Sequence, residues 1–329
     1  MKAIWYNKFG ESKDVLNYGD VPDLSPKTDE VKVELYYSAV NPSDTKKRNG
    51  ANPKLLDDGM VVPNSDGAGV IVEVGKKVDS SRIGERVWIF NAQYEQNLGT
   101  SAEFVCVPQF QAVPLPDNAS YEIGAMMGIP AMTAHRAVFS DGSLENQNVL
   151  ITGGAGRVGF YAIQWAKMAG ATVIATAGNK RSIEDCKLAG ADLVVGHLDE
   201  SVVKEILDFT KGVKISRVIE GDFAANLNPV LDLLDFNAVI ATYSSMTNMF
   251  PEIPFVRMMF MDITIRMILV YAMKKDAKKA AIDDIYEALK MNKLKHRIAE
   301  TIDLRQSVKA HELIEQGSNY GCVLLKIKE

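Results

Sequence analysis

Apolar and polar residues alternate in short runs through the first third of the chain. The runs at residues 31–35 and 70–74 have the period of two that is typical of a half-buried strand. Two further apolar runs, at residues 86–90 and 104–107, are bounded by a Gly-Glu turn and by a proline. Short strands at this spacing predict a compact β-rich domain.

The pattern changes near residue 121, where helical periods begin. Residues 123–139 predict a helix in which Pro130 starts or kinks a turn. From residue 148 onward strands alternate with helices. The predicted strands are 149–152, 172–177, 193–195, 217–219 and 238–241, and the predicted helices are 160–169, 182–189 and 200–210. Repeated βα units of this length predict an α/β fold with a doubly wound parallel sheet.

The last third is less regular. Residues 263–271 form a long apolar run that predicts a strand, and 323–327 predict a final strand. Helical periods at 276–291 and 306–316 lie between them. No internal repeat or long linker separates the parts, so we expect the two folding units to pack tightly with a substrate cleft between them.

Composition and charge narrow the class of protein. The 329 residues are 47% hydrophobic and 24% charged, with a net charge of −5, which indicates a globular chain of two domains. The negative charge counts against nonspecific nucleic-acid or anionic-membrane binding, and no apolar run is long enough to span a membrane. Three scattered cysteines fit neither a disulfide framework nor a zinc cluster. We therefore expect a cytoplasmic protein without a metal.

A glycine-rich loop joins the strand at 149–152 to the helix that follows it. Residues 154–159 fit the pattern G-x-G-x-x-G, with Gly154 for a tight turn and Gly156 for close approach of the backbone to a pyrophosphate. Gly159 then allows the helix and strand to pack closely, and Arg157 and Val158 open the helix. The free N–H groups of a helix start bind phosphate, so the loop predicts a dinucleotide site.

The end of the second strand of this unit indicates which dinucleotide binds. A site for NAD usually has an acid there, which bonds the ribose hydroxyls, but here the strand ends at Ala177 and Gly178. The residues that follow are able to bind a 2′-phosphate through side-chain charges or backbone N–H groups, and they are Asn179, Lys180, Arg181 and Ser182. The alternative is that Lys180 and Arg181 only form a solvated helix start. The missing acid favours NADPH.

In the order of these parts the chain resembles the medium-chain dehydrogenase/reductase superfamily, and within it the zinc-free quinone oxidoreductase (zeta-crystallin-like) branch. The stretches that carry the resemblance are 39–45, 64–70, 84–87, 128–134, the glycine loop and a late stretch from Glu312 to Gly317 and Ser318. The resemblance implies a GroES-like catalytic domain at 1–122, completed by 272–329, and a Rossmann NADPH-binding domain at 123–271.

Zinc-dependent members of the superfamily carry metal ligands that this chain lacks. Asn41, Ser65 and Ile129 stand at or near the positions where those members have cysteine, histidine and a second cysteine. Catalytic zinc needs three nitrogen, sulfur or oxygen ligands from the protein. The four histidines are scattered without ligand spacing. We therefore expect no functional zinc.

Without a metal, a hydride acceptor must already be electron-poor, as quinones and α,β-unsaturated carbonyls are. The nicotinamide supplies the hydride, and the protein supplies orientation and a hydrogen bond to the developing oxyanion. We assign Asn41, Asp44 and Ser65 to this catalytic site, with Asn41 as the amide donor and Asp44 orienting the loop or delivering a proton. The alternative is that residues 41–44 form only an Asx-type turn.

The resemblance also implies further cofactor contacts. Thr133 would lie near the nicotinamide, and His197 would flank the phosphate of the adenine ribose. Asn226 and the turn Tyr243, Ser244 and Ser245 would line the pyrophosphate and the nicotinamide ribose.

Three questions stay open at this level. An NADPH-dependent alkene reductase of conjugated ketones would use the same site as a quinone reductase. An NADPH-binding protein with a structural or RNA-binding role would need a basic stripe with interleaved aromatics, and the run at 274–279 lacks them. The apolar strand at 263–270 has an edge that predicts a homodimer, unless a loop or helix covers it.

Overall fold

The computed structural model describes residues 1–317 and 319–328, which form two compact units. One unit comprises residues 1–129 and 282–329, and the other comprises 130–281. These divisions lie seven and ten residues beyond the predicted ends at 122 and 271. Residues 123–129 belong to the first unit, where the Ile129 N–H donates to Asp66, and residues 272–281 belong to the second.

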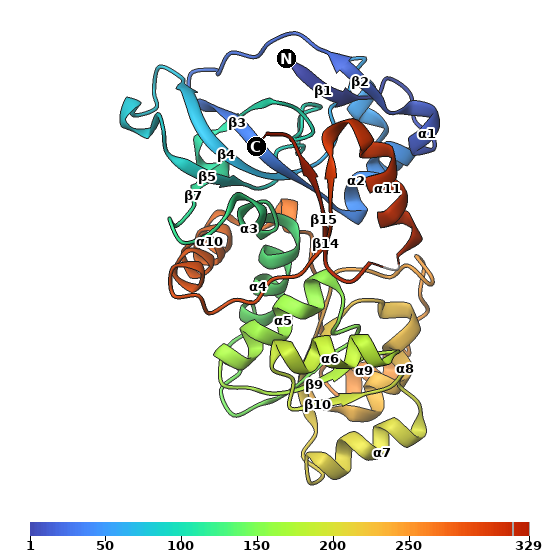
Figure 1. Cartoon of the computed structure of the whole chain (residues 1–329). Helices are drawn as coiled ribbons and strands as arrows, with labels where there is room; N and C mark the ends of the chain where they lie inside the picture. The colour runs from blue at the N-terminus through green and yellow to red at the C-terminus, as the bar shows by residue number, and fades with distance from the viewer. Residues whose placement is uncertain (318, 329) are drawn as a thin grey trace. The chain divides into compact units, whose positions relative to one another are not determined.

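A mostly antiparallel sheet of seven strands forms the centre of the first unit (Figure 1). Its order is β14-β15-β3-β4-β5-β7, and β6 pairs with the first half of β3. A separate hairpin joins β1 to β2. The strands of this unit are β1 Lys2–Trp5, β2 Asn17–Asp20, β3 Glu30–Val40, β4 Asp66–Val74, β5 Arg86–Ile89, β6 Phe104–Pro108, β7 Ala112–Pro114, β14 Ile298–Asp303 and β15 Cys322–Lys326.

Short helices close the ends of this sheet. The α-helices of the first unit are α1 Ser12–Val15, α2 Pro42–Lys46, α3 Tyr121–Ala125 and α11 Ser307–Gln316, and α10 Lys275–Lys290 extends from one unit into the other. Five short turns of 3-10 or π geometry join them, namely η1 Lys47–Ala51, η2 Pro53–Leu56, η3 Ser80–Arg82, η4 Gln109–Gln111 and η7 Leu304–Gln306. The return of β15 to β3 agrees with the C-terminal segment that the resemblance implies.

The second unit contains a six-stranded parallel sheet of order β10-β9-β8-β11-β12-β13. Its strands are β8 Asn148–Ile151, β9 Thr172–Thr176, β10 Leu193–Val195, β11 Ile215–Glu220, β12 Leu234–Thr242 and β13 Thr264–Met267. The order reverses between β8 and β11, and at such a switch point the carboxyl ends of the strands border a crevice. The doubly wound fold predicted from the βα alternation is therefore confirmed.

Helices cover both faces of this sheet. The chain runs from β8 to β10 in one direction and from β11 to β13 in the other, and right-handed crossovers in opposite directions place their helices on opposite faces. The helices are α4 Met132–Phe139, α5 Arg157–Met168, α6 Lys180–Ala189, α7 Glu200–Phe209, α8 Phe223–Leu233 and α9 Phe255–Phe260, with the short turns η5 Met127–Ala131 and η6 Val270–Ala272. One core of this unit, which includes Leu150, Ile174, Val218 and Ile240, is fully or almost fully buried under α7 and α8.

Two predicted elements differ from the structure. The predicted helix 123–139 is three pieces, since Pro130 lies in a π-type turn between α3 and α4. The predicted strand 263–271 is wrong in length: β13 covers Thr264–Met267 only, and a 3-10 turn begins at Val270. None of the described helices is long and apolar enough to cross a membrane.

Candidate functional site

The glycine loop lies between the end of β8 and the start of α5. The left-handed residue of the turn is Gly153, with φ of +60°, so the prediction that Gly154 makes the tight turn is wrong by one residue. Gly154 instead allows close packing, because an added Cβ would lie 2.8 Å from the Ala175 Cβ and 2.9 Å from the Cys186 Sγ. Gly159 packs as predicted, since a Cβ there would lie 2.5 Å from the carbonyl oxygen of Gly153.

A pocket of about 430 Å³ lies at the carboxyl edge of the parallel sheet. Five of the predicted cofactor residues line it: Gly156, Gly178, His197, Asn226 and Tyr243. Sequence reasoning did not assign the rest of the lining to the site, namely Thr152, Gly153, Thr176, Ala177, Gly221, Asp222 and Ala225. Most of these residues lie at or just after the ends of strands, so the predicted strands offered a signal for them. Asp222 and Ala225 lie at the start of α8, a helix that was not predicted.

Gly178 and His197 form the wall of the pocket at the end of β9. Gly178 faces His197, because a Cβ added at Gly178 would meet the His197 Nε2 at 3.0 Å. Thr176 accepts the Gly153 N–H at 2.9 Å and so ties the glycine loop to β9. No acidic side chain stands at Ala177 or Gly178, and the imidazole occupies the neighbouring wall.

At the start of α6, the structure differs from the prediction for one group, the Ser182 N–H. The Asn179 side chain caps this helix, and its oxygen accepts the Ser182 N–H at 3.0 Å. The Ser182 N–H is therefore engaged within the helix, and the prediction that it is free to bind a phosphate is wrong. Lys180 and Arg181 lie exposed in the first turn, but neither is among the residues that line the pocket.

A buried carboxylate organises the opposite wall of the pocket. The Oε1 of Glu220 accepts bonds from the Thr152 hydroxyl at 2.7 Å, the Asp222 N–H at 2.6 Å and the Asn226 amide at 2.9 Å. Burial raises the pKa of Glu220, and these donors oppose that shift. Tyr243 lies beside it, and burial together with Glu220 raises the pKa of the Tyr243 hydroxyl. The Asn226 side chain is thus fixed toward the strand ends.

The remaining cofactor predictions lie outside this lining. Thr133 is buried on α4. In the turn after β12, the Ser245 hydroxyl donates to the Asn248 carbonyl and accepts the Ala224 N–H, and the Ser244 carbonyl accepts the Phe223 N–H. Gly154, Arg157, Val158 and Gly159 belong to the glycine loop and the first turn of α5 but are not pocket-lining residues. Ser318 lies outside the described residues.

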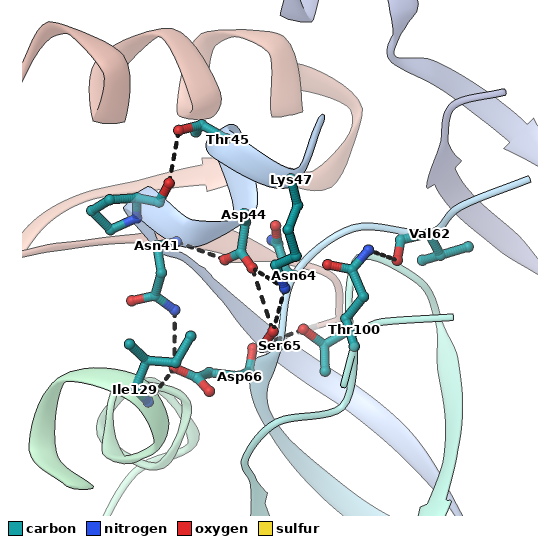
Figure 2. Close-up of polar contacts among 12 residues, drawn as sticks. Asn41, Asp44, Thr45, Lys47, Val62, Asn64, Ser65, Asp66, Thr100 and Ile129 are labelled. Atoms are coloured by element: carbon teal, nitrogen blue, oxygen red, sulfur yellow. Dashed lines mark hydrogen bonds and ion pairs between the residues drawn. The ribbon is translucent and has the colours of Figure 1, made fainter. Parts of the chain in front are cut away.

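A second polar cluster lies in the first unit, where β3 ends and α2 begins (Figure 2). Asn41 is buried at this junction, and Pro42 starts the helix. The Asn41 backbone N–H donates to Asp44 Oδ2 at 2.8 Å. Its side-chain Nδ2 donates to Asp66 Oδ2 at 2.9 Å. Asn41 is thus held at both ends by aspartates, which fixes its amide in one direction.

Asp44 is paired within this cluster. The Lys47 Nζ lies 3.3 Å from Asp44 Oδ1 and also donates to the Ser65 hydroxyl at 3.0 Å, and Ser65 in turn approaches Asp44 Oδ1 at 3.4 Å. Burial raises the pKa of Asp44, while the Lys47 charge and the Asn41 N–H oppose the shift. The three predicted catalytic residues, Asn41, Asp44 and Ser65, are therefore brought together (Figure 2).

Sequence reasoning missed Asp66, although it follows Ser65 directly. Asp66 is fully buried, and its Oδ2 accepts both the Asn41 amide and the Ile129 N–H, the latter at 2.7 Å. Burial and the Asp44 charge raise the pKa of Asp66 to about 8, against the opposing effect of the two N–H donors. A Cβ at Gly128 would lie 2.0 Å from Asp66 Oδ1, so only glycine fits there.

The residues of this cluster do not suit zinc. Asn41 donates its amide to Asp66, the Ser65 hydroxyl accepts from Lys47, and Ile129 has only an apolar side chain. Within residues 1–317 and 319–328, no group of three or more His, Cys, Asp or Glu side chains is placed to hold a metal ion.

Comparison with known proteins gives two family matches. Residues 27–117 match the alcohol dehydrogenase GroES-like domain, and residues 158–287 match the zinc-binding dehydrogenase domain. Among curated proteins, the quinone oxidoreductase of Mus musculus is 33% identical over 242 residues, which are 71% of this chain and 70% of that protein. The chloroplastic quinone-oxidoreductase homolog of Spinacia oleracea is 33% identical over 60% of this chain, and the match spans 61% of its own length.

Further matches include an enoyl reductase and a solved structure. The trans-enoyl reductase tazE of Aspergillus terreus is 33% identical over 229 residues, 64% of this chain and 74% of that protein. The Escherichia coli quinone oxidoreductase, solved in complex with NADPH, superposes with a TM-score of 0.86 over 99% of this chain and 100% of its own, at 22% identity. At that identity the likeness shows the fold.

Proposed function

The chain belongs to the quinone oxidoreductase branch of the medium-chain dehydrogenase/reductase superfamily, and from this premise we propose that it transfers hydride from NADPH to a quinone without a metal. One observation carries the proposal: Asn41, at the position where the resemblance implies a metal ligand in zinc relatives, is an amide donor held in place at both ends. A quinone is electron-poor enough to accept hydride with a hydrogen bond in place of a Lewis acid.

The pocket of the parallel sheet has the form that a dinucleotide requires. Gly156 stands at the N-cap of α5, and the positive end of the dipole of this 12-residue helix would favour a pyrophosphate there. Gly178 and His197 would border the adenosine ribose, and the absence of an acid there suits the 2′-phosphate of NADPH. We infer that Lys180 and Arg181 hold that phosphate from the first turn of α6. When bound, the nicotinamide supplies the hydride.

Asn41 acts on the acceptor oxygen in this proposal. One Nδ2 hydrogen is engaged by Asp66, and the second has no partner among the described residues. That hydrogen donates to the oxygen as negative charge develops on it, and because both ends of Asn41 are already held, little reorganisation accompanies the step. Asp44 holds the Asn41 backbone and is itself paired with Lys47, so we assign it to orientation rather than to proton delivery.

The Aspergillus terreus relative favours a second candidate, reduction of a conjugated carbon–carbon double bond. The test is NADPH oxidation by the purified protein across matched quinones and enones, with the products separated by mass spectrometry. Hydroquinone as the main product supports the proposal. A saturated ketone as the main product assigns the chain to alkene reduction, and no oxidation with any acceptor refutes both. An Asn41→Ala variant serves as the control for reduction at the proposed site.

We also propose a homodimer formed through β13. Among the described strands β13 pairs only with β12, so its other edge carries unpaired backbone groups. Apolar side chains gather near it, with Met267 78% exposed on β13 and Phe260 73% exposed on α9. A second copy that pairs edge to edge would cover both the backbone and this apolar surface.

Light scattering on a size-exclusion column tests the dimer. We expect twice the chain mass at micromolar concentration, and we expect Met267→Lys to shift the mass toward the monomer. Val213→Lys is the matched control, because Val213 is also exposed in the second unit but lies in a loop away from β13. A parent protein of monomeric mass contradicts the proposal.

A further inference from the structure

Asp66 is a buried carboxyl group that the proposed hydride transfer does not yet use. It begins β4, has no exposed surface, and touches the one side chain assigned to the acceptor oxygen. The Asn41 amide and the Ile129 N–H both donate to its Oδ2, and Oδ1 has no hydrogen-bond partner among the described residues. A carboxylate with a bare oxygen in such a site is costly, whereas a carboxylic acid with its proton on Oδ1 is less so.

The charges around Asp66 lead to the same assignment. The charged groups that act on it are Asp44 on α2 and Lys47 on η1. The Lys47 ammonium lies against Asp44 and the Ser65 hydroxyl. One ammonium balances one carboxylate, so ionising both aspartates would leave a net negative charge in a buried cluster. Two neighbouring carboxyl groups then divide their roles, with one charged and one neutral.

We propose that Asp66 is a positioning residue that holds the Asn41 amide as a neutral carboxylic acid, and that its ionisation switches the amide out of its working state. The inference deepens the proposed function and rests on it. A neutral Asp66 accepts one Asn41 hydrogen and leaves the other to the acceptor oxygen. An ionised Asp66 places a full negative charge 2.9 Å from the Asn41 Nδ2 and opposes the negative charge that develops on that oxygen.

The rate is therefore expected to fall as the pH rises through the pKa of Asp66, which is about 8. Since the working form is the protonated one, turnover at pH 9 is expected to be about tenfold lower than at pH 7. In Asp66→Asn the amide cannot ionise, so this alkaline fall is expected to disappear. Asp58→Asn is the matched control, because Asp58 is an exposed aspartate of the same unit, and it is expected to keep the parent profile.

A double-mutant cycle shows whether Asp66 acts through Asn41. In the Asn41→Ala background, Asp66→Asn is expected to leave the shape of the pH profile unchanged, because the amide is already gone. A purely structural role predicts something different: Asp66→Asn would lower turnover equally at every pH and would do so in both backgrounds. An alkaline fall that persists in Asp66→Asn overturns the proposal.

A measurement without turnover separates this proposal from the proposed function. The side-chain amide resonances of Asn41, identified by their loss in Asn41→Ala, are followed by NMR from pH 5 to about 9.5, a range chosen to span the pKa of Asp66. We expect their shifts to titrate with a midpoint near 8 in the parent and not in Asp66→Asn. If no acceptor is reduced but this titration is seen, the proposed function fails and the coupling stands. Amide shifts that do not titrate between pH 5 and about 9.5 overturn the coupling.

Discussion

Replacing Gly178 with aspartate tests the assignment of the cofactor most directly. Gly178 lines the sheet pocket, and a Cβ there would lie 3.0 Å from the His197 Nε2. The imidazole would therefore give way by a few tenths of an ångström. The new carboxylate would stand where relatives that bind NAD carry their acid. We expect Gly178→Asp to prefer NADH.

The size of the effect follows from the charges involved. Two unit charges about 5 Å apart at an effective dielectric constant near 20 repel by about 3 kcal/mol. The 2′-phosphate carries between about 1.5 and 2 negative charges, so its repulsion from the new carboxylate is larger than this value for two unit charges. Because each 1.4 kcal/mol is about tenfold, the ratio of kcat/KM for NADPH to that for NADH is expected to fall by more than about a hundredfold.

The assay is steady-state kcat/KM with each cofactor at a fixed quinone concentration. Gly178→Asn is the matched control, because it adds the same bulk beside His197 without a charge. We expect the control to weaken both cofactors alike and to leave their ratio near that of the parent. Equal ratios in Gly178→Asp and Gly178→Asn would refute the reasoning, since bulk alone would then explain the change. A thermal unfolding scan of each variant shows whether the fold is retained.

Further expectations concern single residues. Asn41→Ala is expected to lower turnover by up to about a hundredfold with NADPH affinity unchanged, measured by stopped-flow and fluorescence titration, and equal turnover would assign Asn41 to the turn alone. Lys180→Ala and Arg181→Ala are each expected to lower the preference for NADPH by about tenfold or more, and unchanged kcat/KM ratios in both would contradict this. Between pH 3.8 and about 8, Asp66 is protonated in the folded state and ionised in the unfolded state, because burial raises its pKa. As the pH rises through this range, the free energy of unfolding of the parent, measured with urea, is expected to fall by up to about 1.4 kcal/mol per pH unit relative to that of Asp66→Asn. The same dependence on pH in both proteins would show that Asp66 is ionised in the fold.

Local patterns predicted the parallel-sheet unit well. The strand at β8, the helix at α5 and the glycine loop between them lie close to their predicted places, since each depends on residues near one another in the chain. The run 263–271 was predicted too long, because apolar periodicity does not tell a strand from an exposed apolar segment. Met267 and Leu269 are both exposed.

The parts of the site that sequence reasoning missed depend on long-range contacts. Asp66 meets Ile129 across 63 residues, and Glu220 meets Thr152 across 68. Neither acid belongs to a spacing pattern. The pairing of β8 with β11 brings Thr152 near Glu220, and the register of β3 and β4 places Asp66 opposite Ala39, whereas Ile129 reaches Asp66 from η5. The shift of the tight turn from Gly154 to Gly153 has a similar cause, because Gly154 is fixed by packing against β9 and α6.

The pairing of β3 with β15 has a consequence for the order in which this chain folds during synthesis. Residues 130–281 are continuous, so that unit is complete before β15 is synthesised. The second half of β3 pairs on one side with residues 323–326 of β15. Tyr37 to Val40 therefore keep an unsatisfied edge until β15 has been synthesised. Since Asn41 follows Val40 directly, we expect the proposed acceptor site to form after the dinucleotide pocket, and loss of β15 would leave that pocket formed and the surroundings of Asn41 incomplete.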